Sequence, residues 1–344
     1  MATRVAINGF GRIGRAFTRL AQGSDMDLVA VNDLGSLQNL AYLLKYDTVY
    51  GRAPFEVSTQ GDSSQRGVSF SIDGKEVKFF SEKDPANLPW KELDIDVVVE
   101  ATGFFTDYEK AQAHITAGAK RVVISAPGKG DEALGATVLM GINEEKFAEH
   151  QITSNASCTT NAVSPLIAIL DEAIGIEKAI LSTTHAYTAS QSIVDGPSKK
   201  DMREGRAAAM NIVPTSTGAA TAVTQAYESL AGKFDGISLR VPVVAGSIAD
   251  VTFIAKRSTT KEEVNEILRG AATAPRWAGI FKTTDEELVS SDIVGEPYAS
   301  IADLGMTRVV DGNLVKVLAW YDNEMGYASS LVTHVRKSGQ SVQA

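Results

Sequence analysis

A glycine-rich turn close to the N-terminus constrains the fold more than any other feature of the chain. Gly9-Phe10-Gly11-Arg12-Ile13-Gly14 fits the pattern G-x-G-x-x-G, and it lies between an apolar run at 5–7 and an amphipathic stretch at 15–22. In a strand–turn–helix unit, such glycines permit a tight turn and let backbone N–H groups approach a pyrophosphate. Asp33 ends the next apolar run, where a carboxylate would bind the adenosine ribose. The pattern predicts a dinucleotide-binding domain.

The same turn also indicates which dinucleotide binds. A carboxylate at Asp33 repels the 2′-phosphate of NADP, and the following Leu34-Gly35-Ser36 supplies no cation to neutralise it. NAD is therefore the expected cofactor. The alternative is a glycine-rich turn with an incidental aspartate, since the chain contains 29 glycines.

The first half of the chain alternates strand and helix patterns. Apolar runs at 97–99 and 121–124 flank a helical stretch at 108–117, as expected for a parallel sheet covered on both faces. Alternation at 68–72 and at 76–79 around Asp73-Gly74 predicts a β-hairpin. We therefore expect an α/β domain of the Rossmann type, a doubly wound parallel sheet with an antiparallel excursion.

The second half of the chain shows a different sequence pattern. Residues 188–217 show little sustained periodicity, and loops of this length are usually functional or lie at interfaces. The remaining patterns predict helices at 162–174, 219–227, 261–272 and 325–335, and strands at 179–183, 237–243, 251–255, 308–310 and 314–317.

Composition excludes several classes of protein. A formal charge of −9 opposes binding to nucleic acid or to anionic lipid, so we expect neither as a partner. One cysteine cannot form an intrachain disulfide or a multi-thiolate metal site, and four histidines make a histidine-rich metal site improbable. We expect no metal. No secretory pattern or membrane span is recognisable, so a cytoplasmic protein is expected.

The single cysteine is a candidate nucleophile. Cys158 lies in the polar segment 154–161, directly before an apolar helical stretch. A thiol at a helix N-terminus feels unpaired N–H groups and the positive end of the helix dipole, which favour the thiolate. The alternative is a buried structural cysteine, which the polar neighbours disfavour.

Two later residues could complete a site around this thiol. His185 follows the strand pattern at 179–183 and could exchange protons with a reacting oxygen, although a buried core histidine is the alternative. Arg240 interrupts an apolar strand and could bind a phosphate, although arginines on solvated strands are common. The segment 215–218 offers donors for another anion or a plain helix N-cap.

Taken together, the motifs closely resemble phosphorylating glyceraldehyde-3-phosphate dehydrogenases, and the likeness runs through essentially the whole chain in the same order. The segments that carry the resemblance are 8–15, 154–161, 185–188, 214–219, 240–242 and 320–324.

The resemblance implies roles for individual residues. Cys158 would be the nucleophile and His185 its activating base. The substrate phosphate would lie near Thr188 and Arg240. The remaining implied contacts are Ser157, Thr159, Thr217 and Gly218 for the attacking inorganic phosphate, and Gly9, Gly11, Arg12, Ile13, Gly14, Asp33, Lys83, Ser125 and Asn323 for NAD.

The resemblance also implies the organisation of the enzyme. Residues 1–157, completed by a C-terminal helix at 323–344, would form the NAD-binding Rossmann domain. Residues 158–322 would form an α+β catalytic domain with a mainly antiparallel sheet. The protein would be a homotetramer, with loop 188–217 at the subunit interface. The substrates would be glyceraldehyde 3-phosphate and inorganic phosphate.

Three positions depart from the family pattern. Ala162 stands where many relatives carry a second cysteine, so we predict that oxidised Cys158 forms a mixed disulfide or a higher oxide instead of a local disulfide. Val243 replaces a frequent threonine, and Lys83 a frequent arginine.

Three other functions compete with this interpretation. An erythrose-4-phosphate dehydrogenase would share the architecture and the Cys/His pair. A non-catalytic NAD-binding interaction protein would not need Cys158, His185 and Arg240 together. A Cys–His hydrolase would leave the glycine turn without a role.

Overall fold

The computed structural model describes residues 2–60, 69–198 and 201–343. The chain folds into two compact units. The first comprises Met1–Val138, Glu144–Ala156 and Leu331–Ala344, and the second comprises Leu139–Asn143 and Ser157–Ser330.

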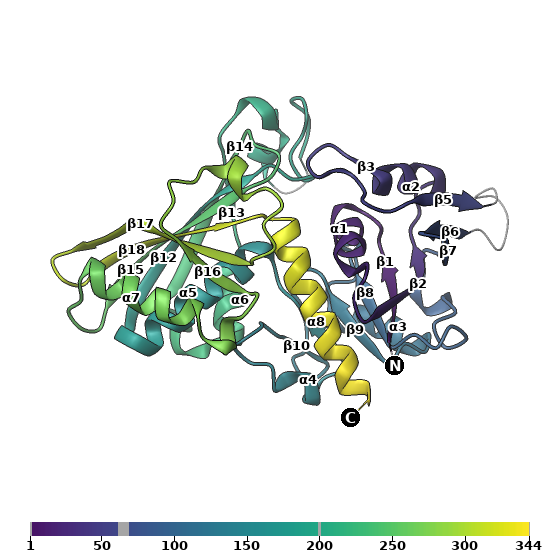
Figure 1. Cartoon of the computed structure of the whole chain (residues 1–344), viewed down its shortest axis with the longest axis horizontal. Helices are drawn as coiled ribbons and strands as arrows, with labels where there is room; N and C mark the ends of the chain where they lie inside the picture. The colour runs from purple at the N-terminus through teal and green to yellow at the C-terminus, as the bar shows by residue number, and fades with distance from the viewer. Residues whose placement is uncertain (1, 61–68, 199–200, 344) are drawn as a thin grey trace. The chain divides into compact units, whose positions relative to one another are not determined.

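A twisted sheet with a parallel centre forms the first unit. Within the described residues its strand order is β10-β11-β9-β8-β1-β2-β7-β6-β5 (Figure 1). Every neighbouring pair from β10 to β7 is parallel, whereas β7-β6 and β6-β5 are antiparallel. The predicted α/β sheet with an antiparallel excursion is confirmed. The strands are β1 (Thr3–Asn8), β2 (Met26–Asn32), β5 (Val57–Gln60), β6 (Ser69–Ile72), β7 (Lys75–Phe80), β8 (Val97–Glu100), β9 (Arg121–Ile124), β10 (Gly135–Thr137) and β11 (Ile152–Ser154).

The hairpin between β6 and β7 follows from its turn residues. Asp73 and Gly74 both have positive φ, 48° and 80°, as the right-handed strand twist requires of a two-residue turn. The predicted hairpin is confirmed, although Val68, its first expected residue, lies outside the described residues.

Helices connect the parallel strands of this unit. They are α1 (Arg12–Ala21), α2 (Leu37–Lys45), α3 (Tyr108–Thr116) and α4 (Lys146–Glu149). A short hairpin of β3 (Tyr46–Asp47) and β4 (Gly51–Arg52) follows α2. The last helix, α8 (Met325–Gln343), belongs to the first unit from Leu331 onward. The sequence patterns missed α2, whose N-cap Ser36 accepts a hydrogen bond from Asn39 N.

The second unit is built on a mainly antiparallel sheet. Its strand order in the described part of the chain is β13-β14-β12-β15-β18-β17-β16, with only β12-β14 and β16-β17 parallel among those neighbours. The predicted α+β architecture is confirmed. The strands are β12 (Ile176–Ala186), β13 (Val213–Ser216), β14 (Phe234–Val241), β15 (Ser247–Ala255), β16 (Phe281–Thr284), β17 (Ser300–Val310) and β18 (Leu314–Tyr321).

Three helices cover one face of this sheet: α5 (Cys158–Ile174), α6 (Ala219–Ala226) and α7 (Lys261–Ala272) (Figure 1). α5 is apolar nearly all round and packs on β15, β17 and β18 in the core. It starts at Cys158, four residues earlier than its hydrophobic periodicity predicts, because Ser157 caps it by accepting from Thr160 N.

The segment 188–217 is less irregular than expected. It contains two short 3₁₀ helices, Met202–Gly205 and Ala208–Met210, and the edge strand β13. The expectation of a loop reaching Thr217 is wrong for residues 213–216, because four residues are too short to show a period. Lys199 and Lys200 lie outside the described residues. In the part of the chain that the structure describes, no helix is long and apolar enough to cross a membrane.

Candidate active site

A thiol and an imidazole meet in the second unit. Cys158 is the first residue of α5, and His185 is the penultimate residue of β12. The Cys158 Sγ and His185 Nε2 atoms are 3.3 Å apart, within the hydrogen-bonding range of sulfur. The structure therefore brings together the two residues that sequence spacing alone could not place side by side.

Arg240 lies beside this pair because β12 and β14 are parallel neighbours. Their register pairs His185 with Arg240, which places both side chains on one face of the sheet. Arg240 Nη1 is 2.6 Å from His185 Nδ1. No ion pair of Arg240 is found among the described residues, and its Nε is buried without a hydrogen-bond partner. A cation without a counter-charge next to a thiol is suited to binding an anion.

Tyr321, the last residue of β18, connects several elements of this site. Its hydroxyl is 2.9 Å from Thr159 Oγ1 and 2.8 Å from Thr183 Oγ1, and its ring packs edge-on against His185. Sequence reasoning gave Tyr321 no role. The alternating pattern of the strand indicates that Tyr321 points inward, but the sequence does not reveal its partners on α5 and β12.

Burial shifts the pKa of both groups of this pair. Burial raises the pKa of the Cys158 thiol, while Arg240 and hydrogen bonds at Thr159 oppose that rise. Burial and Arg240 lower the pKa of His185 to about 3. Cys158 does lie at a helix N-terminus as expected, and backbone hydrogen bonds there lower the pKa of its thiol, although burial has the larger effect.

The residues expected to bind phosphate lie on three elements of the same unit. Ser157 caps α5, and Thr159 is in the first turn of that helix. Thr217 accepts a hydrogen bond from Ala219 N at the start of α6, where Gly218 is the N-cap. Thr188 follows β12 and contacts Ser190 and Gln191 through its hydroxyl. Hydroxyls and helix N-termini of this kind suit an anion.

The first unit contains a separate pocket of about 500 Å³ next to the glycine turn. Asp33 lies at its edge and accepts hydrogen bonds from Phe10 N and Gly35 N, both at 2.7 Å. The carboxylate therefore holds the glycine turn itself, a role that the sequence did not reveal. The lining residues are Asn8, Gly9, Gly11, Asn32, Asp33, Leu34, Glu82, Lys83, Ala101, Thr102, Phe104 and Phe105.

A buried polar row under this pocket also escaped sequence reasoning. Asn32, Asn8 and Glu100 are the last residues of the adjacent strands β2, β1 and β8. Asn32 Nδ2 donates to Asn8 Oδ1 at 2.7 Å, and Asn8 Nδ2 donates to Glu100 Oε2 at 2.6 Å. His114 Nε2 lies 3.1 Å from the same carboxylate oxygen. Polar residues that end three neighbouring strands were the available signal.

Comparisons with known proteins match both halves of the chain. Residues 3–108 match the model of the glyceraldehyde 3-phosphate dehydrogenase NAD binding domain, and 157–323 match that of its C-terminal domain. A glyceraldehyde-3-phosphate dehydrogenase 2 of Streptomyces avermitilis is 49% identical over 96% of this chain and 97% of its own length. That of Mycobacterium avium is 47% identical over 99% of this chain and 100% of its own.

The chain belongs to the glyceraldehyde 3-phosphate dehydrogenase family. The sequence-based resemblance is confirmed, and with it NAD as the cofactor. In this family member the pocket of the first unit fits the group. Gly9 has φ +97°, and a Cβ there would stand 2.6 Å from Thr102 N. The exposed side chains of Leu34 and Phe104 offer apolar contacts for an adenine.

Five of the expected cofactor residues are not part of this pocket lining: Arg12, Ile13, Gly14, Ser125 and Asn323. Arg12 pairs with Asp47 at 2.5 Å, and neither it nor Ile13 lines the pocket. Ser125 follows β9, with its hydroxyl buried and unpartnered. Asn323 lies in the second unit and accepts from Ser247 Oγ at 3.0 Å. Their roles toward NAD remain predictions, whereas Lys83 does line the pocket.

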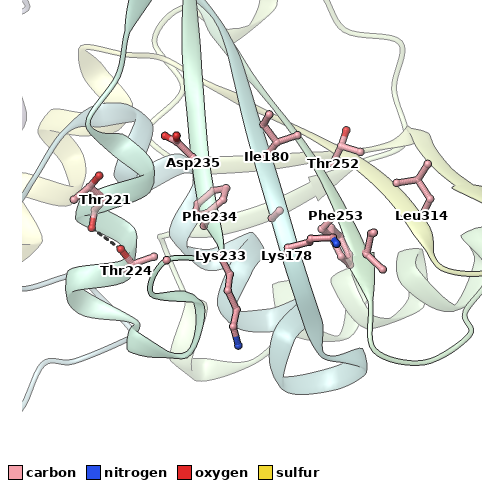
Figure 2. A pocket seen from close by; sticks show the side chains of 13 residues that line it. Lys178, Ile180, Thr221, Thr224, Lys233, Phe234, Asp235, Thr252, Phe253 and Leu314 are labelled. Carbon is pink, nitrogen blue, oxygen red and sulfur yellow. Dashed lines mark hydrogen bonds between the residues drawn. The ribbon is translucent and has the colours of Figure 1, made fainter.

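A further open pocket, of about 770 Å³, lies in the second unit away from the thiol (Figure 2). It is formed at β12, β14 and β15, near the start of β18 and beside α6, and none of Cys158, His185 and Arg240 lines it. Figure 2 shows Lys178, Lys233, Ile180 and Leu314 among the side chains that line it. It carries no thiol or imidazole and so lacks the groups for the family's chemistry.

Proposed function

We propose that this protein catalyses the NAD-dependent oxidative phosphorylation of glyceraldehyde 3-phosphate to 1,3-bisphosphoglycerate. The observation that carries the proposal is the contact of 3.3 Å between Cys158 Sγ and His185 Nε2, beside the guanidinium of Arg240, which forms no ion pair within the described residues. Relatives that carry the name glyceraldehyde-3-phosphate dehydrogenase match almost the full length of the chain. The reaction serves glycolysis or gluconeogenesis.

Cys158 and His185 carry the covalent steps of this proposal. The Cys158 sulfur forms a bond to the aldehyde carbon, and its proton passes through His185 to the aldehyde oxygen, giving a hemithioacetal. His185 then removes the proton of the hemithioacetal hydroxyl while a hydride leaves the same carbon, giving a thioester. Bound NAD would supply the acceptor for that hydride, held by the glycine turn and Asp33.

Inorganic phosphate completes the reaction by attacking the thioester carbon. The thiolate of Cys158 leaves, and the acyl group departs as an acyl phosphate. Arg240 and Thr188 would hold the phosphate of the substrate. Ser157, Thr159, Thr217 and Gly218 would orient the attacking phosphate through hydroxyls and backbone N–H groups at the starts of α5 and α6.

The decisive experiment measures NADH formation from glyceraldehyde 3-phosphate, with and without inorganic phosphate. The unmodified protein should form NADH catalytically only when phosphate is present. Cys158→Ser should lower kcat at least about a thousandfold, because it removes the nucleophile, while leaving NAD affinity unchanged. Dehydrogenase activity that survives this substitution would refute the mechanism. If the protein instead oxidised erythrose 4-phosphate faster, and without inorganic phosphate, it would be an erythrose-4-phosphate dehydrogenase.

We also propose that the enzyme is a homotetramer. Segment 188–217 exposes large apolar side chains, including Ile193, Met202 and Met210, each at least 81% exposed. The outer face of the second sheet exposes Ile180 and Ile237 as well. Exposed apolar groups in such number are typical of interaction surfaces. Four subunits of 36.6 kDa give about 146 kDa, which light scattering during gel filtration would detect. A monomer mass would contradict this assembly.

The remaining organisation is proposed on the same resemblance. Residues 1–157 and 323–344 would bind NAD, and 158–322 would form the catalytic domain with interface loop 188–217. The enzyme would act in the cytoplasm, without nucleic acid, membrane or metal. Cell fractionation with antibody detection would test the location, since recovery with membranes would contradict it.

A further inference from the structure

The Glu100 carboxylate fixes the direction of a buried hydrogen-bonded chain in the first unit. Asn32 Nδ2 donates to Asn8 Oδ1 at 2.7 Å, and Asn8 Nδ2 donates to Glu100 Oε2 at 2.6 Å. An amide can donate or accept, depending on which end it presents, whereas a carboxylate can only accept. Glu100 is 1% exposed, so bulk water cannot take over these bonds. The carboxylate therefore determines which way both amides point.

A neutral histidine donates to the same carboxylate oxygen. Trp90 Nε1 lies 3.1 Å from His114 Nδ1, and an indole N–H can only donate, so Nδ1 accepts and carries no proton. The ring proton is then on Nε2, which lies 3.1 Å from Glu100 Oε2 and donates to it. Among the described residues, no lysine or arginine pairs with Glu100. A buried carboxylate that lacks a cation depends on each of its neutral donors.

The second oxygen of this carboxylate holds a segment that lines the pocket. Glu100 Oε1 accepts from Thr102 N at 2.8 Å and also from the Thr102 hydroxyl. That hydroxyl in turn accepts from Phe104 N at 3.1 Å. Thr102 and Phe104 both line the pocket next to the glycine turn. Glu100 therefore connects the polar chain to the lining segment 101–105.

Segment 101–105 lies directly against the glycine turn. A Cβ added to Gly9 would stand 2.6 Å from Thr102 N, so the two backbones are in close contact. Ala101 N donates to Asn8 O at 2.7 Å, next to the same turn. Because the backbones are packed this closely, a shift of Thr102 would displace the turn or open a gap beside it. The bond from Thr102 N to Glu100 therefore also fixes the position of the turn.

The other end of the chain holds a second lining segment. Asn32 Oδ1 accepts from Glu82 N at 2.8 Å, and Asn32 Nδ2 donates to Glu82 O at 2.9 Å. Both bonds require the amide orientation that the carboxylate imposes along the chain. Glu82 and Lys83 line the pocket and follow β7, whereas segment 101–105 follows β8. Because β1 and β2 lie between those two strands, the chain runs from one lining segment to the other.

We propose that Glu100 is a positioning residue for NAD. Its carboxylate sets the spacing between the lining segments 82–83 and 101–105 and keeps the glycine turn in place before the cofactor arrives. A pocket that is already ordered loses less conformational freedom on binding, so its affinity is higher. Glu100 itself does not line the pocket. The inference rests on assigning this pocket to NAD, and it is independent of the proposed roles of Cys158 and His185.

Glu100→Gln tests the inference, because it keeps the size of the side chain and replaces one acceptor with a donor. The new NH2 group must face either Asn8 and His114 or Thr102, all of which donate there. The Kd for NAD, measured by calorimetry with NAD alone, should rise at least about tenfold. The KM for NAD should rise in parallel, with kcat at saturating NAD within about twofold of the unmodified enzyme. An unchanged Kd would overturn the inference.

Thr153→Val separates positioning from a general loss of stability. Thr153 is a buried residue of β11 in the same unit, and its hydroxyl lies 2.7 Å from His334 Nε2. Valine has a similar shape without the hydroxyl, so this variant should also lower the urea midpoint of unfolding. Because Thr153 does not line the pocket, the Kd for NAD should stay within about twofold. If Thr153→Val weakens NAD binding as much as Glu100→Gln does, the effect is one of stability and the inference fails.

A pair of variants at His114 gives the same answer if Glu100→Gln does not fold. His114 is fully buried and does not line the pocket. His114→Gln and His114→Leu both remove Nδ1, the acceptor of Trp90, but only glutamine can still donate to Glu100. The Kd for NAD should rise about threefold or more in His114→Leu and less in His114→Gln, and equal values would contradict the inference. Failure of the unmodified protein to bind NAD would overturn the assignment of the pocket as well, whereas unchanged affinity in the variants would overturn only the role of Glu100.

Discussion

The two units build their sites in opposite ways. In the first, the pocket is formed largely at the glycine turn, by residues that end β1 and β2 and by residues that follow β8. In the second, the proposed chemistry depends on side chains from separate elements, with Cys158 on α5, His185 on β12 and Arg240 on β14. A site formed by backbone groups of one turn is determined by the local sequence. A site formed by side chains from several elements depends on how the strands pair.

This difference explains how far each site could be predicted. The glycine turn and Asp33 were sufficient for the dinucleotide unit, because the strand–turn–helix motif contains its own geometry. The residue types of the catalytic site were also recognisable. Their meeting was not, because the parallel pairing of β12 with β14 joins His185 and Arg240 across a separation of 55 residues.

The first prediction tests whether the glycine turn of the first unit requires the backbone conformation that Gly9 adopts. Gly9→Ala should destabilise the fold by about 3 kcal/mol or more, because a Cβ at φ +97° would stand 2.6 Å from Thr102 N and 2.7 Å from the Ala101 carbonyl carbon. Urea unfolding would measure the loss. NAD binding should weaken with it.

Gly11→Ala is the matched control. A Cβ on Gly11 meets no atom within 4 Å, and its φ of −70° suits alanine. Its cost to folding should be at most about 1 kcal/mol, the price of a poorer helix N-cap. Because Gly11 lines the pocket, NAD should still bind at least about tenfold more weakly. Equal free energies of unfolding for Gly9→Ala and Gly11→Ala would show that the turn does not depend on the backbone conformation and close packing at Gly9.

The second prediction concerns the acid stability of the first unit, to which His334 belongs. His334 of α8 is buried, accepts from the Thr153 hydroxyl at Nε2 and donates from Nδ1 to Asn155 Oδ1. Burial and Lys337 lower the pKa of His334 to about 3, below its ordinary value near 6.5. Between these values the unfolded chain binds a proton that the folded chain does not, so stability present above pH 6.5 is lost as pH falls.

The loss from His334 should reach about 2 kcal/mol between pH 6.5 and pH 5. His334→Gln should be less stable than the unmodified protein at pH 7, but its stability should fall less steeply over this range. Unfolding by urea at a series of pH values would give both slopes. Parallel slopes would mean that His334 is protonated in the folded protein and contributes nothing to acid lability.

Residue contacts also explain which elements of each unit could be predicted from the sequence. The hairpin at Asp73-Gly74 and the helix at 261–272 were predicted because their signals are local and strong. β13 was missed because it is short and owes its existence to pairing with β14. The burial of the Cys158 thiol, which raises its pKa, could not be foreseen either, since elements distant in the sequence bury it.

The smallest expected effect separates the two roles of Asp33, one structural and one toward the cofactor. Asp33→Asn keeps a side-chain oxygen for one of the two backbone donors, Phe10 N or Gly35 N, and loses the charge. The KM for NAD should rise about tenfold, which corresponds to a loss of about 1.4 kcal/mol of binding free energy. The kcat should be nearly unchanged, because the proposed catalytic side chains belong to the second unit. Discrimination against NADP should relax, since the repulsion of a 2′-phosphate is gone. Steady-state kinetics with both cofactors would measure these changes, and thermal unfolding would report on the turn. If the unmodified enzyme already preferred NADP, the carboxylate would serve only to hold the glycine turn, and the dinucleotide site would be a backbone site entirely.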